Sequence, residues 1–126
     1  SVQGSVQEER VEEFEGKPQF VYEIPDANYE KPIILRNLPF VSNHLSKNDG
    51  IIGVYLELNK DLVPALMVRY AAPMTTSRIW ELLNMEKWTI TYAEDDVREV
   101  DAKLKFKTPG VEMPYQGSAL EAVLAE

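Results

Sequence analysis

The stretch IIGVYLELNKDLVPALMVRY at 51–70 limits the possible folds more than any other part of the chain. Its β-branched and aromatic residues predict two antiparallel strands joined by a short turn near Lys60 and Asp61. Because successive side chains of a strand point to opposite faces, the length of this turn decides which residues share a face. A two-residue turn would place Arg69 among aliphatic side chains, whereas a turn over 60–62 leaves one face wholly apolar. We therefore predict the turn with an odd number of residues.

This register assigns the residues of both strands to one face or the other. The apolar face contains Ile52, Val54, Leu56, Leu58, Leu66, Val68 and Tyr70. The second face contains Gly53, Tyr55, Glu57, Ala65, Met67 and Arg69. The same register brings Glu57 within diagonal reach of Arg69. Since the second face is too apolar to be left in water, we expect either a small C-terminal helix or another protein to cover it.

An earlier pair of segments also predicts a hairpin. The segments 18–24 and 32–38 are rich in β-branched and aromatic residues, and the turn between them contains Pro25. The segment 37–50 is interrupted by Pro39 and ends in Asn-Asp-Gly, so we predict a connecting loop there, with at most a short turn of helix.

A last hairpin is predicted from the alternating segments 87–93 and 98–107. Its core face would consist of Trp88, Ile90, Tyr92, Val100, Ala102, Leu104 and Phe106. The segment 108–117, with two prolines and two glycines, is predicted to be a loop.

Two segments have the period of a helix. In 73–88 an apolar stripe is formed by Ile79, Leu82 and Leu83, and we expect a threonine cap at position 75 or 76 and a stop at Asn84. The segment 118–126 begins with a capping box and predicts a short C-terminal helix. The sequence therefore predicts an α+β fold, with an antiparallel sheet of about six strands, one mid-chain helix and one short C-terminal helix.

The length of 126 residues suits one domain with its own core. Residues 1–8 are small and polar, and we predict that they form a flexible arm preceding a single domain at 9–126. The sequence contains neither a signal segment nor a transmembrane segment, so we expect a soluble, cytoplasmic protein that does not bind membranes.

The net charge of −8 is concentrated in the two ends of the chain. Residues 1–31 contain eight acids and three bases, and residues 78–126 contain ten acids and six bases. Because nucleic acid binding depends on clustered Lys and Arg, such a partner is disfavoured. A neutral or basic protein surface is the partner that the charge favours.

The sequence offers few groups for catalysis or for metal binding. There is no cysteine, and His44 is the one histidine, so thiolate chemistry and a site with two histidines are excluded within one chain. Five carboxylates lie between Glu94 and Asp101, but no glycine follows them as a calcium loop requires. We interpret these acids as a solvated hairpin turn, and we predict neither a metal nor a cofactor.

These observations favour a non-catalytic protein for interaction or assembly: an acidic adaptor, an inhibitor or an oligomeric subunit. Viral accessory and structural proteins often have this character. The predicted contact residues are those of the second hairpin face, Tyr55, Glu57, Ala65, Met67 and Arg69, together with Tyr29 and Tyr115 in acidic, proline-containing loops. The alternative is a small hydrolase or ligand-binding domain that uses carboxylates and tyrosines around a pocket.

Overall fold

The computed structural model describes residues 14, 16–26, 34–102 and 104–116. Within these ranges it contains six strands and two helices. In chain order they are β1 (Gln19–Pro25), α2 (Ile34–Ser46), β2 (Ile51–Leu58), β3 (Pro64–Ala71), α3 (Thr76–Leu83), β4 (Lys87–Ala93), β5 (Asp96–Asp101) and β6 (Val111–Pro114). Every strand pair is antiparallel, so the predicted α+β class with an antiparallel sheet is confirmed.

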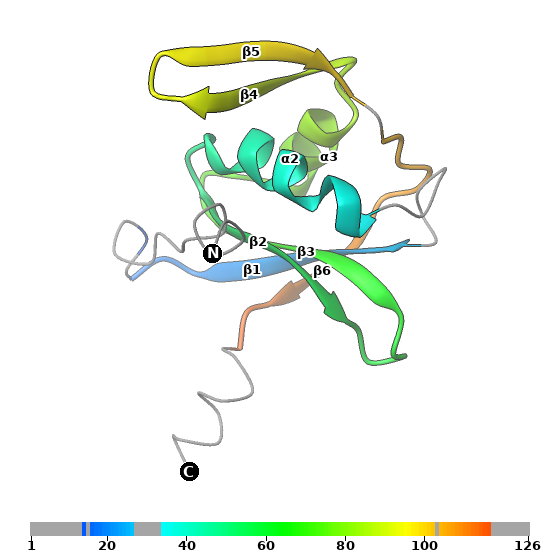
Figure 1. The fold of residues 1–126 in the computed structure, drawn as a ribbon. Helices are drawn as coiled ribbons and strands as arrows, with labels where there is room; N and C mark the ends of the chain where they lie inside the picture. The colour runs from blue at the N-terminus through cyan, green and yellow to red at the C-terminus, as the bar shows by residue number, and fades with distance from the viewer. Residues whose placement is uncertain (1–13, 15, 27–33, 103, 117–126) are drawn as a thin grey trace.

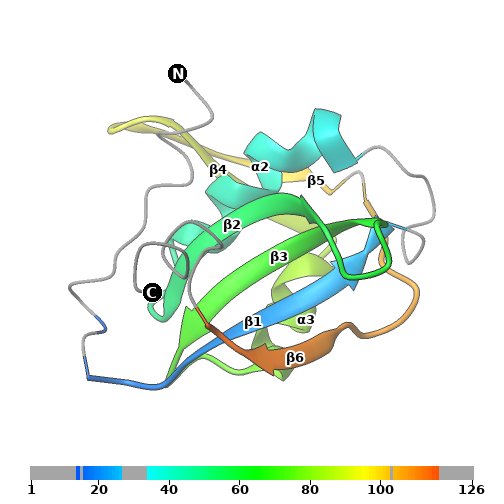
Figure 2. The same cartoon turned by 90° about the horizontal axis from the view of Figure 1, so that it is seen from below.

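The described elements form three layers (Figure 1). A four-stranded sheet has the order β2-β3-β1-β6, and α2 and α3 cover one of its faces. The hairpin of β4 and β5 lies on the far side of the helices. Figure 2, seen from below, shows the other face of the four-stranded sheet with neither α2 nor α3 in front of it. We call this side the open face.

The turn between β2 and β3 has the predicted odd length. Val54 pairs with Val68, and Leu56 pairs with Leu66, as the predicted register requires. The N–H of Asn59 donates to the carbonyl of Val63 at 2.9 Å, which leaves residues 60–62 as the turn. Leu62 adopts a φ of 61°, the left-handed conformation that closes a three-residue hairpin loop.

One residue of the predicted apolar face lies elsewhere. A β-bulge between Ile51 and Gly53 turns Ile52 away from Val54, because an inserted residue reverses the alternation on one side of it. Ile52 therefore belongs to a small separate cluster with Phe14 and Ala71. The prediction that it shares a face with Val54 was wrong.

The segment 32–38 is not the strand that the sequence predicted. Its described part belongs to α2, which continues through most of the predicted loop 37–50. The buried residues Asn37, Val41, His44 and Leu45 recur at helical spacing and pack toward the rest of the structure. Pro39 removes one backbone donor near the start of the helix, but this packing outweighs the loss. Tertiary contacts thus override the local signal of the proline.

The mid-chain helix agrees with its prediction. In α3 the side chain of Thr75 accepts a hydrogen bond from the backbone N–H of Arg78 at 3.2 Å, and the C-cap is Asn84. The buried face consists of Ile79, Leu82 and Leu83.

The hairpin of β4 and β5 is confirmed in the main, with Trp88 opposite Val100. Its second strand is shorter than predicted and ends at Asp101. A second bulge, between Thr91 and Ala93, frees Tyr92 from the ladder. The Tyr92 side chain is 49% exposed, so its predicted place in the core was wrong.

Helix α2 holds this hairpin by bonding to its backbone. The side chain of Asn43 accepts a hydrogen bond from the N–H of Thr91 at 2.9 Å and donates one to the Thr91 carbonyl at 3.0 Å. Lys47 donates to the carbonyl of Thr89 at 2.6 Å. The edge of β4 that does not pair with β5 therefore forms hydrogen bonds with side chains of α2 and of Lys47, which follows it. These side chains take the place of a neighbouring strand. We call the pair of bonds from Asn43 the Asn43 clamp.

The segment 111–114, predicted to be part of a loop, forms the edge strand β6 and pairs with β1. Its residues are exposed, so the strand has little of the buried, β-branched character that marks a strand in a sequence. The predicted arm at 1–8 and the predicted C-terminal helix at 118–126 lie outside the described residues.

Replacing Asn43 with Leu should lower the free energy of unfolding by about 1–3 kcal/mol, because two partly buried backbone groups of Thr91 lose their partner. Urea denaturation measures this loss. Lys47→Met is the matched control, since it removes one exposed bond to the same strand and should cost less than about 1 kcal/mol. Equal losses in the two variants would show that the Asn43 clamp is not what holds the hairpin.

Candidate functional site

The open face is built from rows of residues that pair directly across the strands. One row contains Gly53, Arg69, Val21 and Met113. The next contains Tyr55, Met67, Glu23 and Val111, and a third contains Glu57, Ala65 and Pro25. The alternate residues, such as Val54, Val68 and Tyr22, belong to the main core beneath the helices. Paired residues share a face, so these rows point away from α2 and α3.

The structure gathers six of the seven predicted contact residues on this face. Five come from the hairpin of β2 and β3, in the predicted register. Tyr115 joins them because its backbone N–H donates to the carbonyl of Gln19 at 3.0 Å, which continues the pairing of β6 with β1. Tyr29 lies outside the described residues.

Arg69 is the charged group at the centre of the open face. It is only 4% exposed, and its guanidinium carbon lies 3.6 Å from the ring centroid of Tyr115. Its Nε donates to the side-chain oxygen of Gln19 at 2.8 Å. A guanidinium stacked on an aromatic ring retains its charge while it is shielded from water. Arg69 therefore ties β3 to the residue that follows β6.

The predicted pairing of Arg69 with Glu57 was wrong. Arg69 lies opposite Gly53, and Glu57 lies opposite Ala65. The two positions are thus four residues apart along the ladder, or roughly 13 Å, which is too far for a diagonal contact.

The middle of the open face is buried and its β6 side is exposed. Ala65 and Met67 are 0% and 7% exposed, whereas Val111 and Met113 are 60% and 36% exposed. Tyr55 is half-buried, and Glu57 is exposed. Near the hairpin turn, Glu23 accepts a hydrogen bond from the side chain of Asn59 at 3.1 Å. An apolar strip bordered by polar groups is the usual composition of a contact surface.

Sequence reasoning missed the β6 part of this face. Val111, Met113 and Tyr115 alternate with Glu112 and Pro114, which is the two-residue period of a strand. The prolines and glycines around the segment concealed that signal, and the short exposed strand gave no apolar run to support it.

His44 belongs to the interior rather than to a reaction centre. It is 4% exposed, its ring is stacked 5.1 Å from that of Trp88, and its Nε2 donates to the carbonyl of Leu82 at 2.8 Å. Burial lowers the pKa of His44, the charges of Lys47 and Arg78 act in the same direction, and the bond to Leu82 opposes them. The imidazole is therefore held neutral, as a packing group in the core.

The acidic turn has the character that the sequence predicted. Asp96 accepts two hydrogen bonds of 2.9 Å from Arg98, which lower the pKa of Asp96, and Asp101 pairs with Lys87 at 3.2 Å. The residues that the structure describes contain no group of three or more acids or histidines placed to hold a metal ion.

Comparisons of the chain with models of protein families, with curated protein sequences and with solved structures give no match. Among the described residues, no helix is long and apolar enough to cross a membrane. Function is therefore inferred from the open face itself.

The stability of the protein should fall as the pH drops below 6.5, the ordinary pKa of histidine, because the unfolded chain then binds a proton that buried His44 resists. Above pH 6.5 the imidazole is neutral in both states and the contribution is fully present. The slope cannot exceed about 1.4 kcal/mol per pH unit for one proton. His44→Gln, which keeps a donor for Leu82 and does not titrate, should remove this slope between pH 7 and 5.5 in urea denaturation. An unchanged slope would assign it to other groups.

Calcium and magnesium should leave the melting temperature unchanged in the wild type and in the variant Asp95→Asn/Asp96→Asn, because an ion bound to the folded state would stabilise it by mass action. Differential scanning fluorimetry with and without each ion provides the measurement. A rise with calcium that disappears in the double variant would contradict the interpretation of these acids as a solvated turn.

Proposed function

We propose that the protein is a non-catalytic module for protein–protein interaction or assembly that packs the open face of its sheet against another protein. The observation that carries this proposal is the apolar strip at β6, where Val111 and Met113 are 60% and 36% exposed beside the buried Met67. Apolar side chains that gather on one sheet face lose unfavourable contact with water when a partner covers them.

The position of β6 adds to this support. It is the last strand in the sheet order, so one side of its backbone pairs with no other strand among the described residues. An edge of this kind can accept an added strand, while side chains of the same strand contact the partner across the face. Val111 and Met113 would then contribute to both parts of the contact.

Charge favours a neutral or basic partner surface. The chain has a net charge of −8, and exposed Glu57 borders the open face. Charges of opposite sign speed up association and disfavour unsuitable partners. The acidity also works against self-association, although a second copy that pairs its apolar strip with the first is the other form of this proposal. We place this activity in the cytoplasm.

The alternative of a hydrolase has weaker support. His44, the one histidine that could serve as a catalytic base, is buried and forms a hydrogen bond with the carbonyl of Leu82. The carboxylates of Asp96 and Asp101 are each paired with a basic side chain at the surface. A pair of carboxylates for acid–base chemistry needs two such groups directed at one substrate.

Replacing Val111 with Lys should abolish the association, because the contact would have to bury an unpaired charge. Val97→Lys is a matched control: Val97 is also a strand valine, it is 54% exposed, and it lies on the β4–β5 hairpin away from the open face. The two variants carry the same change in charge. Circular dichroism should show both to be folded, whereas Met67→Glu should unfold because Met67 is buried within the chain.

Two measurements compare the variants. Light scattering gives the solution mass and detects self-association, and affinity capture from cells of the source organism detects a different partner. We expect an assembly or a captured protein that is present with the wild type and with Val97→Lys and absent with Val111→Lys. If Val111→Lys behaves like its control in both measurements, the open face is not the contact surface.

A further inference from the structure

The outer edge of β6 presents backbone groups that pair with no strand within the part of the chain that the structure describes. Figure 2 shows β6 at the border of the four-stranded sheet. In an antiparallel pair, residues that exchange hydrogen bonds alternate with residues whose N–H and carbonyl groups point to the other side. The N–H of Tyr115 donates to the carbonyl of Gln19 at 3.0 Å, so Met113, two residues earlier, is the next residue bonded to β1. The outward residues of β6 are therefore Glu112 and Pro114.

These two residues differ in what they offer to an added strand. Glu112 offers an N–H and a carbonyl, whereas Pro114 offers a carbonyl alone because proline has no N–H. An antiparallel strand can therefore exchange two hydrogen bonds with Glu112 and donate one more to Pro114. The proline removes the next donor, so the pairing is centred on Glu112.

Both ends of β6 are held in place, so this edge is formed in the absence of a partner. At the start, the N–H of Gly110 donates to the Tyr22 hydroxyl at 2.8 Å, and a Cβ at Gly110 would lie 2.1 Å from the carbonyl oxygen of Glu23. At the end, the ring centroid of Tyr115 lies 3.6 Å from the guanidinium carbon of Arg69. A strand that is already extended needs little reorganisation to accept another strand.

The side chains of β6 define the residues that an added strand needs. Glu112 is exposed and lies opposite Tyr22, a residue of the core on the helix side of the sheet, so the residue paired with Glu112 would point to that side. A basic residue there would pair with the carboxylate, and the net charge of −8 favours its approach. The two neighbours of this residue would lie opposite Val111 and Met113 in non-hydrogen-bonded pairs, where side chains come closest. Apolar residues suit these two positions.

A second copy of the chain fits this edge poorly. If β6 paired with itself about Glu112, two carboxylates of like charge would lie directly opposite each other. A shift of two residues in one direction places Glu112 opposite Pro114, which has no N–H to donate. A shift in the other direction places it opposite Gly110, whose N–H already donates to Tyr22. The edge therefore favours a segment of a different protein.

We propose that the β6 edge binds an extended segment of another protein as an added antiparallel strand, with an apolar, a basic and an apolar residue in succession. The basic residue exchanges hydrogen bonds with the backbone of Glu112 and pairs with its carboxylate, while its neighbours pack on Val111 and Met113. This inference rests on the function proposed above, because it assigns the contact at the open face to backbone pairing and specifies the segment that binds.

Three capped peptides of equal length test the proposal. The first is acetyl-Thr-Val-Lys-Val-Thr-amide, the second has Glu in place of Lys, and the third retains Lys but carries a methyl group on the Lys backbone nitrogen. Each is titrated to millimolar concentration into the full chain, and binding is followed by the backbone signal of Glu112 in ¹H–¹⁵N spectra. The Lys peptide should shift this signal in a saturable way and bind roughly fivefold more tightly than the Glu peptide. The methylated peptide should not bind, because it lacks the N–H that donates to Glu112.

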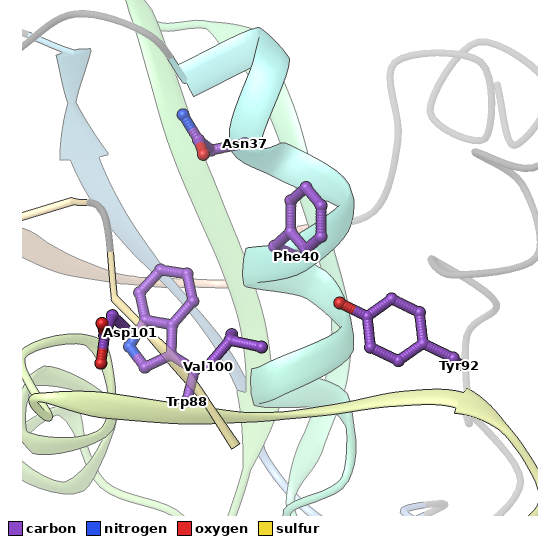
Figure 3. Close-up of a pocket in the computed structure, with 6 residues that line it drawn as sticks. All are labelled: Asn37, Phe40, Trp88, Tyr92, Val100 and Asp101. Atoms are coloured by element: carbon purple, nitrogen blue, oxygen red, sulfur yellow. The ribbon is translucent and has the colours of Figure 1, made fainter. Parts of the chain in front are cut away.

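A cleft between α2 and the β4–β5 hairpin provides a control for apolar contact elsewhere (Figure 3). Its lining includes the apolar side chains of Phe40 and Val100, and the hairpin lies on the far side of the helices from the open face. The backbone signal of Val100 should stay in place with all three peptides. A saturable shift at Val100 without one at Glu112 would place the binding in the cleft and overturn the proposal, as would the absence of a saturable shift at Glu112 with the Lys peptide.

Variants of the chain separate backbone pairing from charge. Glu112→Pro removes the outward N–H, leaves the groups that bond to β1 in place, and should abolish binding of the Lys peptide. Glu112→Ala retains the N–H and should bind the Lys and Glu peptides with nearly equal affinity. The backbone signals of Val21 and Met113 check that β6 still pairs with β1 in both variants. If Glu112→Pro loses that pairing, the methylated peptide on the wild type decides the same question. Wild-type affinity for the methylated peptide, or for the Lys peptide in a correctly paired Glu112→Pro, would contradict strand addition.

Affinity capture and light scattering distinguish a failure of this proposal from a failure of the proposed function. Strand addition requires that Glu112→Pro and Val111→Lys both lose the captured protein. Loss with Val111→Lys alone would keep the open face as the contact surface and overturn strand addition. Loss with neither variant would overturn both proposals. A wild-type dimer that Glu112→Pro abolishes would assign the edge to a second copy and overturn the choice of partner.

Discussion

The turn between β2 and β3 is the constraint on which the rest of the sheet depends. Asn59 fixes it, because its side-chain oxygen accepts hydrogen bonds from the N–H groups of Asp61 and Val63 at 2.8 and 3.0 Å. The side chains of β3 alternate between the two faces of the sheet. The odd number of residues in the turn decides which of them point toward the helices and which point toward the open face. Since β1 pairs with the other edge of β3, and β6 pairs with β1, the same alternation continues across all four strands. A shift of one residue would put Arg69 into the core under α2.

The alternation of side chains along two paired strands can be read from a sequence. This is why most of the residues that β2 and β3 contribute to the open face were predictable. Five residues were placed on one face without knowledge of any tertiary contact. The same reasoning fails at a bulge, because one extra residue reverses the alternation and leaves no mark in the pattern of residue types. Ile52 was misplaced for this reason.

The elements that could not be predicted are those whose stability comes from distant parts of the chain. Helix α2 includes Pro39, and its support comes from contacts such as the bond from Ser42 to the Val54 carbonyl and the bonds from Asn43 to Thr91. Strand β6 is short and exposed, and it is defined by its pairing with β1. Local propensity is a weak signal wherever tertiary contacts decide the conformation. The β6 half of the candidate site was missed because the site depends on this long-range pairing.

The position of α2 also determines how the β4–β5 hairpin relates to the open face. Consecutive residues of this helix reach in opposite directions, since Ser42 bonds to β2 in the four-stranded sheet and Asn43 bonds to β4 in the hairpin. The helix layer therefore separates the hairpin of β4 and β5 from the open face (Figure 1). Changes at distant sites without shared partners add independently in their effect on stability. Val111 and Val100 lie on strands at opposite sides of that layer, so the effects of substitutions at these two positions on the free energy of unfolding should add.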